Sequence, residues 1–182
     1  MSHPNKPRIF VAQADGAVAI RIVGKANVAV STVFRDILAH LRSEEAGRIH
    51  LLLDSCLLMD STFLGTLAQQ GVDHSTATGN PRPGRIVLVQ PSARVLELIE
   101  NLGVLDVFRI ETEPPGIEFV FQPLETPTEC DLREITRTSL EAHRTLMALN
   151  EENQARFEGV TELLEKELEG SEGPGGKGGA GR

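Results

Sequence analysis

Residues 56–65 read Cys-Leu-Leu-Met-Asp-Ser-Thr-Phe-Leu-Gly. An apolar run at residues 49–53, typical of a strand buried on both faces, precedes this stretch. The first four residues of the stretch are expected to form an apolar turn. A stripe with helical spacing follows, formed by Leu64, Leu67, Ala68 and Val72. The stretch therefore predicts a passage from a buried strand into an amphipathic helix.

Asp60, Ser61 and Thr62 occupy the expected start of that helix. Such residues are frequent N-caps because their side-chain oxygens accept hydrogen bonds from the free N–H groups of the first turn. One of the three is enough for a cap. A surplus hydroxyl at this place is well suited to carry a phosphate, since the free N–H groups and the helix dipole stabilise an anion. The residues alone leave both roles open, and capping is the more common one.

The segments on either side continue the alternation of strands and helices. Apolar runs at 9–13 and 18–23 flank Ala14-Asp15-Gly16, which is typical of a hairpin turn. A helical stripe runs from Val30 to Leu41, and residues 86–89 form a second buried strand. Ser92 is placed to cap a further helix, which Gly103 ends. This order predicts an α/β domain with a parallel or mixed sheet, to which residues 117–121 add an edge strand.

The C-terminal part differs in composition. Residues 129–169 carry a net charge of -6, lack Pro, and contain a single Gly, which predicts one long helix. An apolar seam from Leu132 to Leu163 includes Asn153, as a buried residue that sets the register, and Arg156, which weakens the seam. The seam fits either a coiled coil, and hence a homo-oligomer, or a helix lying on its own domain.

Both ends of the chain are expected to be disordered. Residues 1–7 are polar, and residues 170–182 are rich in Gly. Such segments bury too little apolar surface to offset the entropy lost on ordering.

Three stretches together resemble a known family. Residues 59–65 resemble the Asp-Ser-[Ser/Thr]-Gly-Leu-Gly signature of STAS domains, and residues 93–110 are similar to the last helix and exit of that domain. Gly24-Lys25-Ala26-Asn27 stands where the family has a Gly-x-[Leu/Ala]-[Asp/Asn] turn. The resemblance implies one STAS-like α/β domain over residues 8–125, with a mixed sheet and helices mainly on one face. A C-terminal helical extension follows over 129–169.

The resemblance also implies a function. Anti-sigma-factor antagonists of this family bind an anti-sigma factor that is also a serine/threonine protein kinase, and phosphorylation switches them off. The implied acceptor is Thr62, with Ser61 as second choice, and a PP2C-type phosphatase would remove the phosphate. The implied partner-binding residues are Lys25, Asn27, Asp60, Ser61, Thr62, Phe63 and Gly65. The alternative within the family is a STAS subunit that regulates a transporter ATPase without phosphorylation.

Phe63 departs from the family pattern, which has Gly at this position. Its ring is expected either to fill the groove under the helix or to form an exposed contact for a partner.

Composition narrows the classes of function. The chain has 182 residues, a net charge of -8, and neither Trp nor Tyr. An acidic surface without these rings disfavours nucleic acids and anionic membranes. No apolar run approaches the ~18 residues of a membrane span, and the start lacks a signal-peptide pattern, so we expect a cytoplasmic protein without membrane insertion.

Catalytic and metal chemistry have little support in the sequence. The five His residues share no metal-ligand spacing, and Cys56 is expected to be a small core residue. No base lies near residues 60–62 in the sequence to activate a hydroxyl. We therefore expect a protein-binding module that is not an enzyme and needs no cofactor or metal.

Overall fold

The computed structural model describes residues 7–43, 47–73, 82–125 and 131–170. The strands are β1 (Arg8–Ala14), β2 (Ala17–Ala26), β3 (Ile49–Leu52), β4 (Cys56–Met59), β5 (Val72–Asp73), β6 (Arg82–Pro83), β7 (Ile86–Val89), β8 (Arg109–Glu111) and β9 (Gln122–Leu124). The helices are α1 (Val28–Ser43), α2 (Ser61–Gly71), α3 (Ala93–Asn101), the short 3-10 turn η1 (Leu105–Val107), α4 (Leu132–Leu149) and α5 (Glu152–Gly170).

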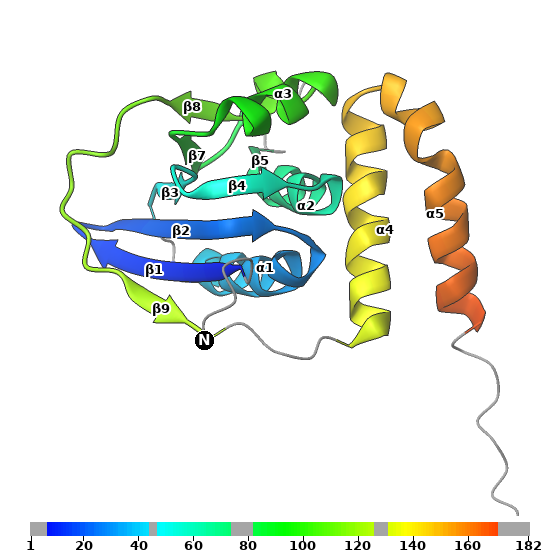
Figure 1. Ribbon diagram of the computed structural model, residues 1–182, viewed down its shortest axis with the longest axis horizontal. Helices are drawn as coiled ribbons and strands as arrows, with labels where there is room; N and C mark the ends of the chain where they lie inside the picture. Colours follow the sequence, from blue (N-terminus) through cyan, green and yellow to red (C-terminus); the bar gives the residue numbers. More distant parts are fainter. Residues whose placement is uncertain (1–6, 44–46, 74–81, 126–130, 171–182) are drawn as a thin grey trace, which may run out of the picture.

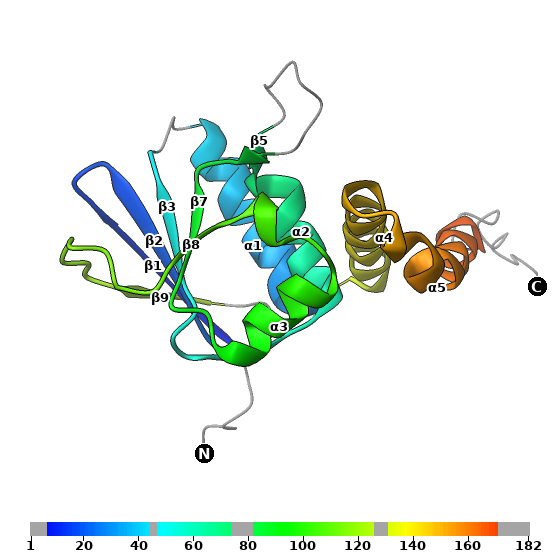
Figure 2. The same ribbon diagram turned by 90° about the horizontal axis from the view of Figure 1, so that it is seen from above.

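The elements form three layers (Figures 1 and 2). A mixed sheet has the order β8-β7-β3-β2-β1-β9, with β4 paired to β2 outside this path. Helices α1, α2 and α3 cover one face of the sheet, and α4 and α5 lie beyond them as a third layer. The expected mixed sheet, with its helices mainly on one face and a C-terminal helical extension, is confirmed.

The strand pairing follows from the connections between strands. The β1–β2 hairpin is antiparallel and turns at Asp15 and Gly16, which both have positive φ angles. Helices connect the parallel pairs β2–β3 and β3–β7, as a parallel crossover requires. Strand β8 extends the parallel side, and β9 pairs antiparallel with β1 at the other edge.

Strand β2 changes its partner along its length. Residues 18–21 pair with β3, whereas residues 24–26 pair with β4 after a register shift. Gly24 lies at this shift with a φ of 91°, a conformation that glycine adopts without strain. The exchange brings the end of β2 beside the end of β4, where the Asp60 N–H donates to the Ala26 carbonyl at 3.0 Å.

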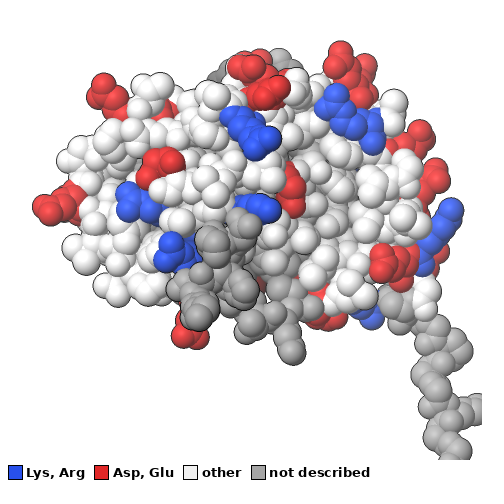
Figure 3. Space-filling model, viewed as in Figure 1, with Lys and Arg blue, Asp and Glu red and all other residues white. Residues whose placement is uncertain are grey.

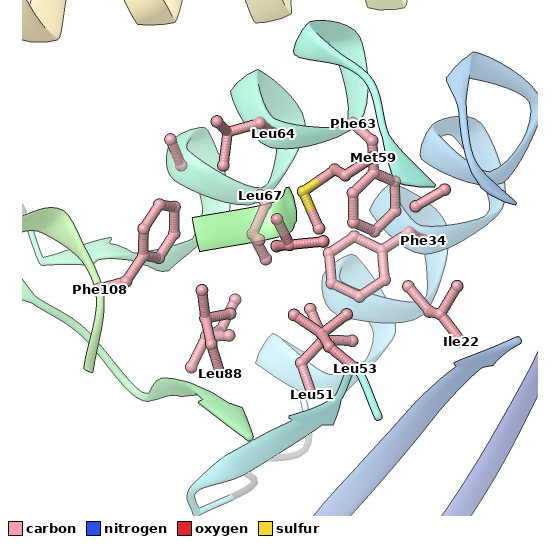
Figure 4. Packing of buried hydrophobic residues seen from close by; sticks show 14 of the residues in the cluster. Ile22, Phe34, Leu51, Leu53, Met59, Phe63, Leu64, Leu67, Leu88 and Phe108 are labelled. Carbon is pink, nitrogen blue, oxygen red and sulfur yellow. The ribbon is translucent and has the colours of Figure 1, made fainter. Parts of the chain in front are cut away.

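The main core lies between the sheet and helices α1, α2 and α3. The rings of Phe34 from α1 and Phe63 from α2 pack with centroids 5.1 Å apart (Figure 4). Around them lie fully buried aliphatic residues of the central strands, such as Ile22, Leu51 and Leu88. Phe63 is fully buried, so of its two expected roles the structure shows the filling of the groove under α2.

A smaller apolar cluster covers part of the opposite face of the sheet. Phe119 and Phe121 pack there against small and branched residues of the strands, and the Arg21 guanidinium lies 4.4 Å from the centre of the Phe121 ring. The edge strand expected at 117–121 is therefore wrong, because these residues use alternate rings to cover the sheet face. The strand that pairs with β1 is β9, which begins one residue later.

Residues 56–59 form strand β4 and not the expected turn. The prediction was wrong because Leu57 and Leu58 are apolar yet exposed, by 61% and 39%, so the run lacks the polar alternation of an edge strand.

The C-terminal segment forms two helices, α4 and α5, where the sequence predicted one. Asn150 interrupts the helix: its side-chain Oδ1 accepts from the Glu152 N–H at 3.1 Å and so caps the start of α5. The two helices pack on each other as a helical hairpin, called the α4–α5 hairpin below, and α4 packs on α2 and α1. Of the two arrangements left open, the structure shows the helix lying on its own domain.

The two polar residues of the expected seam have other roles. Asn153 is fully buried, and its Nδ2 donates to the carbonyls of Leu102 at 2.9 Å and Leu146 at 3.0 Å. Arg156 donates to the Asn101 carbonyl at 2.8 Å. Both residues thus hold the α4–α5 hairpin to the end of α3. Of the segments expected to be disordered, 1–6 and 171–182 lie outside the described residues, while Gly170 ends α5.

Candidate functional site

Asp60 joins two of the three stretches that resemble STAS motifs, residues 24–27 and 59–65. Its Oδ1 accepts from the Phe63 N–H at 2.8 Å, which caps α2, and its own N–H binds the end of β2. Burial raises the pKa of the Asp60 carboxyl above its usual range, and hydrogen bonds from the N–H groups of Phe63 and Val28 oppose this shift. Val28 is the first residue of α1, so one carboxylate contacts the starts of two helices.

Ser61 and Thr62 lie in the first turn of α2, facing α4. The Ser61 Oγ lies 3.0 Å from the Nε2 of His143, and the Thr62 Oγ1 lies 3.4 Å from the Oγ of Ser139. Thr62 is only 7% exposed. The hydroxyl implied as the phosphate acceptor is therefore covered by a helix outside the sheet domain.

Gly65 sets the distance between α2 and α4. A Cβ placed on Gly65 would overlap the backbone carbonyl of Ala142 on α4. Ala142 itself is fully buried. The two backbones approach this closely only because residue 65 has no side chain.

His143 is enclosed between α2 and α5. Its ring stacks on Phe157 with centroids 4.7 Å apart and planes 12° apart. Its Nδ1 is buried and accepts or donates no hydrogen bond within the described part of the chain. Burial lowers the pKa of His143 below its usual range, so the neutral ring is the form that fits here.

Arg35 connects α1 to α4 beside this contact. Its guanidinium donates to Glu134 at 2.7 Å and to the Thr138 hydroxyl at 2.9 Å. The pair with Glu134 is partly exposed. On the face shown in Figure 3, Lys and Arg side chains lie scattered among Asp and Glu.

The remaining residues implied for partner binding lie in different environments. Lys25 is exposed at the end of β2, paired in register with Leu58 of β4. Asn27 precedes α1, and its carbonyl accepts from Val30 and Ser31. The structure thus gathers Asn27, Asp60 and the hydroxyls of residues 61–62 around the starts of α1 and α2.

The described ranges hold neither a metal-binding cluster nor a membrane-spanning helix. No group of three or more His, Cys, Asp or Glu side chains there is arranged to hold a metal ion. No described helix combines the length and the apolar character that a membrane span requires. His3, His74 and Cys130 lie outside the described residues.

Comparison with known proteins gives one kind of match. No family model matches the chain, and no curated protein does. Seven chains of solved structures match. One of them is the anti-sigma factor antagonist SpoIIAA in its unphosphorylated form, with 20% identity and a TM-score of 0.43. That match covers 57% of this chain and 89% of SpoIIAA.

The fold is an α/β domain with a mixed sheet, followed by the α4–α5 hairpin. Within this domain, the sequence motifs located Ser61, Thr62 and Gly65, which lie at the contact with α4, and Asp60, which caps α2 beside it. The motifs did not identify the residues that cover them, Ser139, Ala142 and His143. Ser139 and Ala142 belong to the predicted apolar seam. They are small, uncharged residues among charged neighbours, and this was the only sequence signal that they lie on the buried face of the helix.

Proposed function

We propose that this chain is a regulatory protein-binding module of the anti-sigma-factor-antagonist type, acting in the cytoplasm. In this proposal it binds an anti-sigma factor with serine/threonine kinase activity and releases it when Thr62 is phosphorylated. A PP2C-type phosphatase restores the unmodified form. The surface around the starts of α1 and α2 is the binding surface, formed by Lys25, Asn27, Asp60, Ser61, Thr62 and Gly65.

The convergence of two separate motifs is the observation that carries this proposal. The motif at the end of β2 and the motif at the start of α2 are hydrogen-bonded to each other through Asp60 and Ala26. Asp60 caps α2 through the Phe63 N–H, so the Ser61 and Thr62 hydroxyls are surplus to the helix cap. A hydroxyl in the first turn of a helix is well placed to carry a phosphate.

The modification would change the charge of this surface strongly. The Thr62 Oγ1 would form a bond to the γ-phosphorus of ATP while the bond from that phosphorus to the β–γ bridging oxygen breaks. ADP leaves, and the hydroxyl proton passes to a base of the kinase. The product carries about -1.5 to -2 charge next to Asp60, and like-charge repulsion would disfavour a partner that buries this surface.

Intact-mass spectrometry tests the assignment of the acceptor. The chain is incubated with ATP and candidate anti-sigma-factor kinases, and one phosphate per chain is the expected product. Thr62→Ala should abolish this mass shift, whereas the neighbouring Ser61→Ala should keep most of it. Phosphate retained in Thr62→Ala would contradict the assignment, and loss only in Ser61→Ala would move it to Ser61.

A second candidate is a subunit that regulates a transporter ATPase without phosphorylation. The observation that favours it is the burial of the Thr62 hydroxyl against Ser139, which suits a packing contact better than an acceptor. Here the same face of α2 would bind the partner. No phosphate would then appear on the chain with any kinase, and Thr62→Glu and Thr62→Gln would weaken binding equally.

A third candidate is an enzyme with Ser61 as the nucleophile. It is considered because His143, which is distant in the sequence, lies beside Ser61 and could act as a base. The Nε2 of His143 is within hydrogen-bond distance of the Ser61 Oγ. Among the described residues, however, no carboxylate binds the Nδ1 of His143 to orient the ring, as a catalytic triad requires. We assign this pair to the packing of α4 on α2.

A further inference from the structure

We propose that the α4–α5 hairpin is an autoinhibitory cover, which must leave the start of α2 before Thr62 can be phosphorylated or a partner can bind. This inference rests on the proposed function and adds the regulation of that site. It concerns the closed state, in which α4 occupies the surface that a partner would use.

The first support is the occlusion of the acceptor. Thr62 is 7% exposed, and its hydroxyl lies 3.4 Å from that of Ser139. A kinase must place the acceptor oxygen in line with the γ-phosphate, within its own active site. Because α4 stands in that space, phosphoryl transfer requires α4 to move.

The second support is the polar, small-residue character of the covering contact. At the start of α2, Ser61, Thr62 and Gly65 contact α4, whose facing residues are Ser139, Ala142 and His143. The apolar anchors of the hairpin in the main core are Leu146, one turn beyond Ala142 on α4, and Phe157, which stacks on His143 within the hairpin itself. Opening at the acceptor end therefore exposes little apolar surface, which keeps its free-energy cost low.

The third support is that a phosphate and the closed state exclude each other. The contact between the Thr62 and Ser139 oxygens leaves no room for a phosphorus atom and three further oxygens. The added charge would also face a buried, neutral imidazole on one side and Asp60 on the other. Phosphorylation would thus hold the hairpin open until the phosphate is removed.

A thiol at the acceptor position measures the cover without any kinase. Thr62→Cys is made in a Cys130→Ser background, which leaves the buried Cys56 as the only other thiol. The rate of reaction with Ellman's reagent is then measured on the native full chain. We expect slow labelling, with Gly65→Ala raising the rate roughly tenfold or more, because the added Cβ overlaps the Ala142 carbonyl.

Gly159→Ala is the matched control. It adds the same methyl group in α5, where nothing lies within 4 Å of the new Cβ, so the labelling rate should stay unchanged. Equal rates for Gly65→Ala and Gly159→Ala would overturn the proposal, as would fast labelling of the parent.

A second pair of variants places the change in the cover itself. Ala142→Leu enlarges a fully buried residue of α4, whereas Ala148→Leu makes the same change at an exposed one. Only Ala142→Leu should speed labelling, while thermal melts confirm that both variants fold. A slow rate in folded Ala142→Leu would overturn the proposal even if Gly65→Ala fails to fold.

The kinase assay separates the cover from the proposed function. Ala142→Leu, with Thr62 intact, should take up phosphate at least about tenfold faster than the wild type, matching the thiol result. Accelerated thiol labelling with no phosphate uptake in any variant would reject Thr62 as acceptor and leave the cover supported. Equal phosphate uptake in both proteins, together with unchanged thiol labelling, would reject the cover and leave the acceptor assignment standing.

Discussion

Ser61 and His143 are 82 positions apart in the chain, yet the Ser61 Oγ and the His143 Nε2 lie 3.0 Å apart across the contact between α2 and α4. The contact joins the start of the helix that carries the motif to the helix that covers it. It also makes the covering contact sensitive to the protonation of one buried ring.

The burial of His143 should make the folded protein less stable in mild acid. Its pKa is lowered by burial, so the folded state binds fewer protons than the unfolded state, in which the pKa is near 6.5. Its contribution is therefore fully present above pH 6.5 and is lost as the pH falls from there toward the folded-state pKa. The melting temperature of the wild type should drop in this window relative to that of His143→Gln, as followed by circular dichroism.

Comparison with His143→Gln isolates this effect from other groups. The pKa of His50 is also lowered by burial, and that of Asp60 is raised, which favours the folded state as the pH falls. Both groups are present in the two proteins and cancel in the difference. A difference that does not change between pH 8 and pH 5 would contradict the prediction.

Asn153→Ala should destabilise the α4–α5 hairpin. The Asn153 Nδ2 donates to the carbonyls of Leu102 and Leu146, and the side chain is fully buried. Both carbonyls also accept from Asn150, so the variant loses two buried hydrogen bonds without orphaning either acceptor, at about 0.5–1.5 kcal/mol of unfolding free energy each. Urea unfolding measures the loss, and Gln154→Ala, at the exposed neighbouring position, should change little.

The ion pair between Arg35 and Glu134 should contribute to the packing of α4 on α1, and exchanging both charges should restore it. Glu134→Arg sets two like charges against each other between α1 and α4, where the ion pair now measures 2.7 Å. The pair is partly exposed, so the loss should be only about 0.2–1 kcal/mol. Thermal melts measure this loss, and the double variant Arg35→Glu with Glu134→Arg should recover most of it. If the double variant is no more stable than Glu134→Arg, the ion pair does not hold the two helices together.

Phe63→Ala should be among the most damaging single changes. The ring is fully buried against Phe34, and its removal leaves a cavity that costs about 3–5 kcal/mol. Phe10→Ala removes the same ring from a half-buried position on β1 and should cost clearly less. Equal losses in urea unfolding would mean that Phe63 does not fill the groove beneath α2.

Local patterns predicted most of the sheet domain. The apolar runs at 49–53 and 86–89 became β3 and β7, and Ser92 caps α3 with its side chain accepting from the Val95 N–H. These predictions succeeded because burial on both faces and helix capping are each determined by a few adjacent residues. Strand β4 was missed because its exposed leucines hide the alternation that marks an edge strand.

The covering of the site could not be predicted in the same way. Nothing near residues 60–62 in the sequence indicates Ser139 or His143, since their contacts depend on how α4 packs in three dimensions. The break at Asn150 did have a local signal. Asn is a preferred N-cap, and two glutamates follow it, which favours a new helix start.

The attachment of the α4–α5 turn to the end of α3 determines how α4 would move. Asn150 and Asn153 both donate to the Leu102 carbonyl, which makes this end a pivot. Ser139 lies 11 residues before Asn150 along α4, or about 16 Å at the rise of an α-helix. A rotation of about 15° around the pivot would therefore displace Ser139 by roughly 4 Å, in addition to its present distance from Thr62. The helix acts as a lever arm, in which a small angular change at α3 becomes a distance large enough to free the hydroxyl.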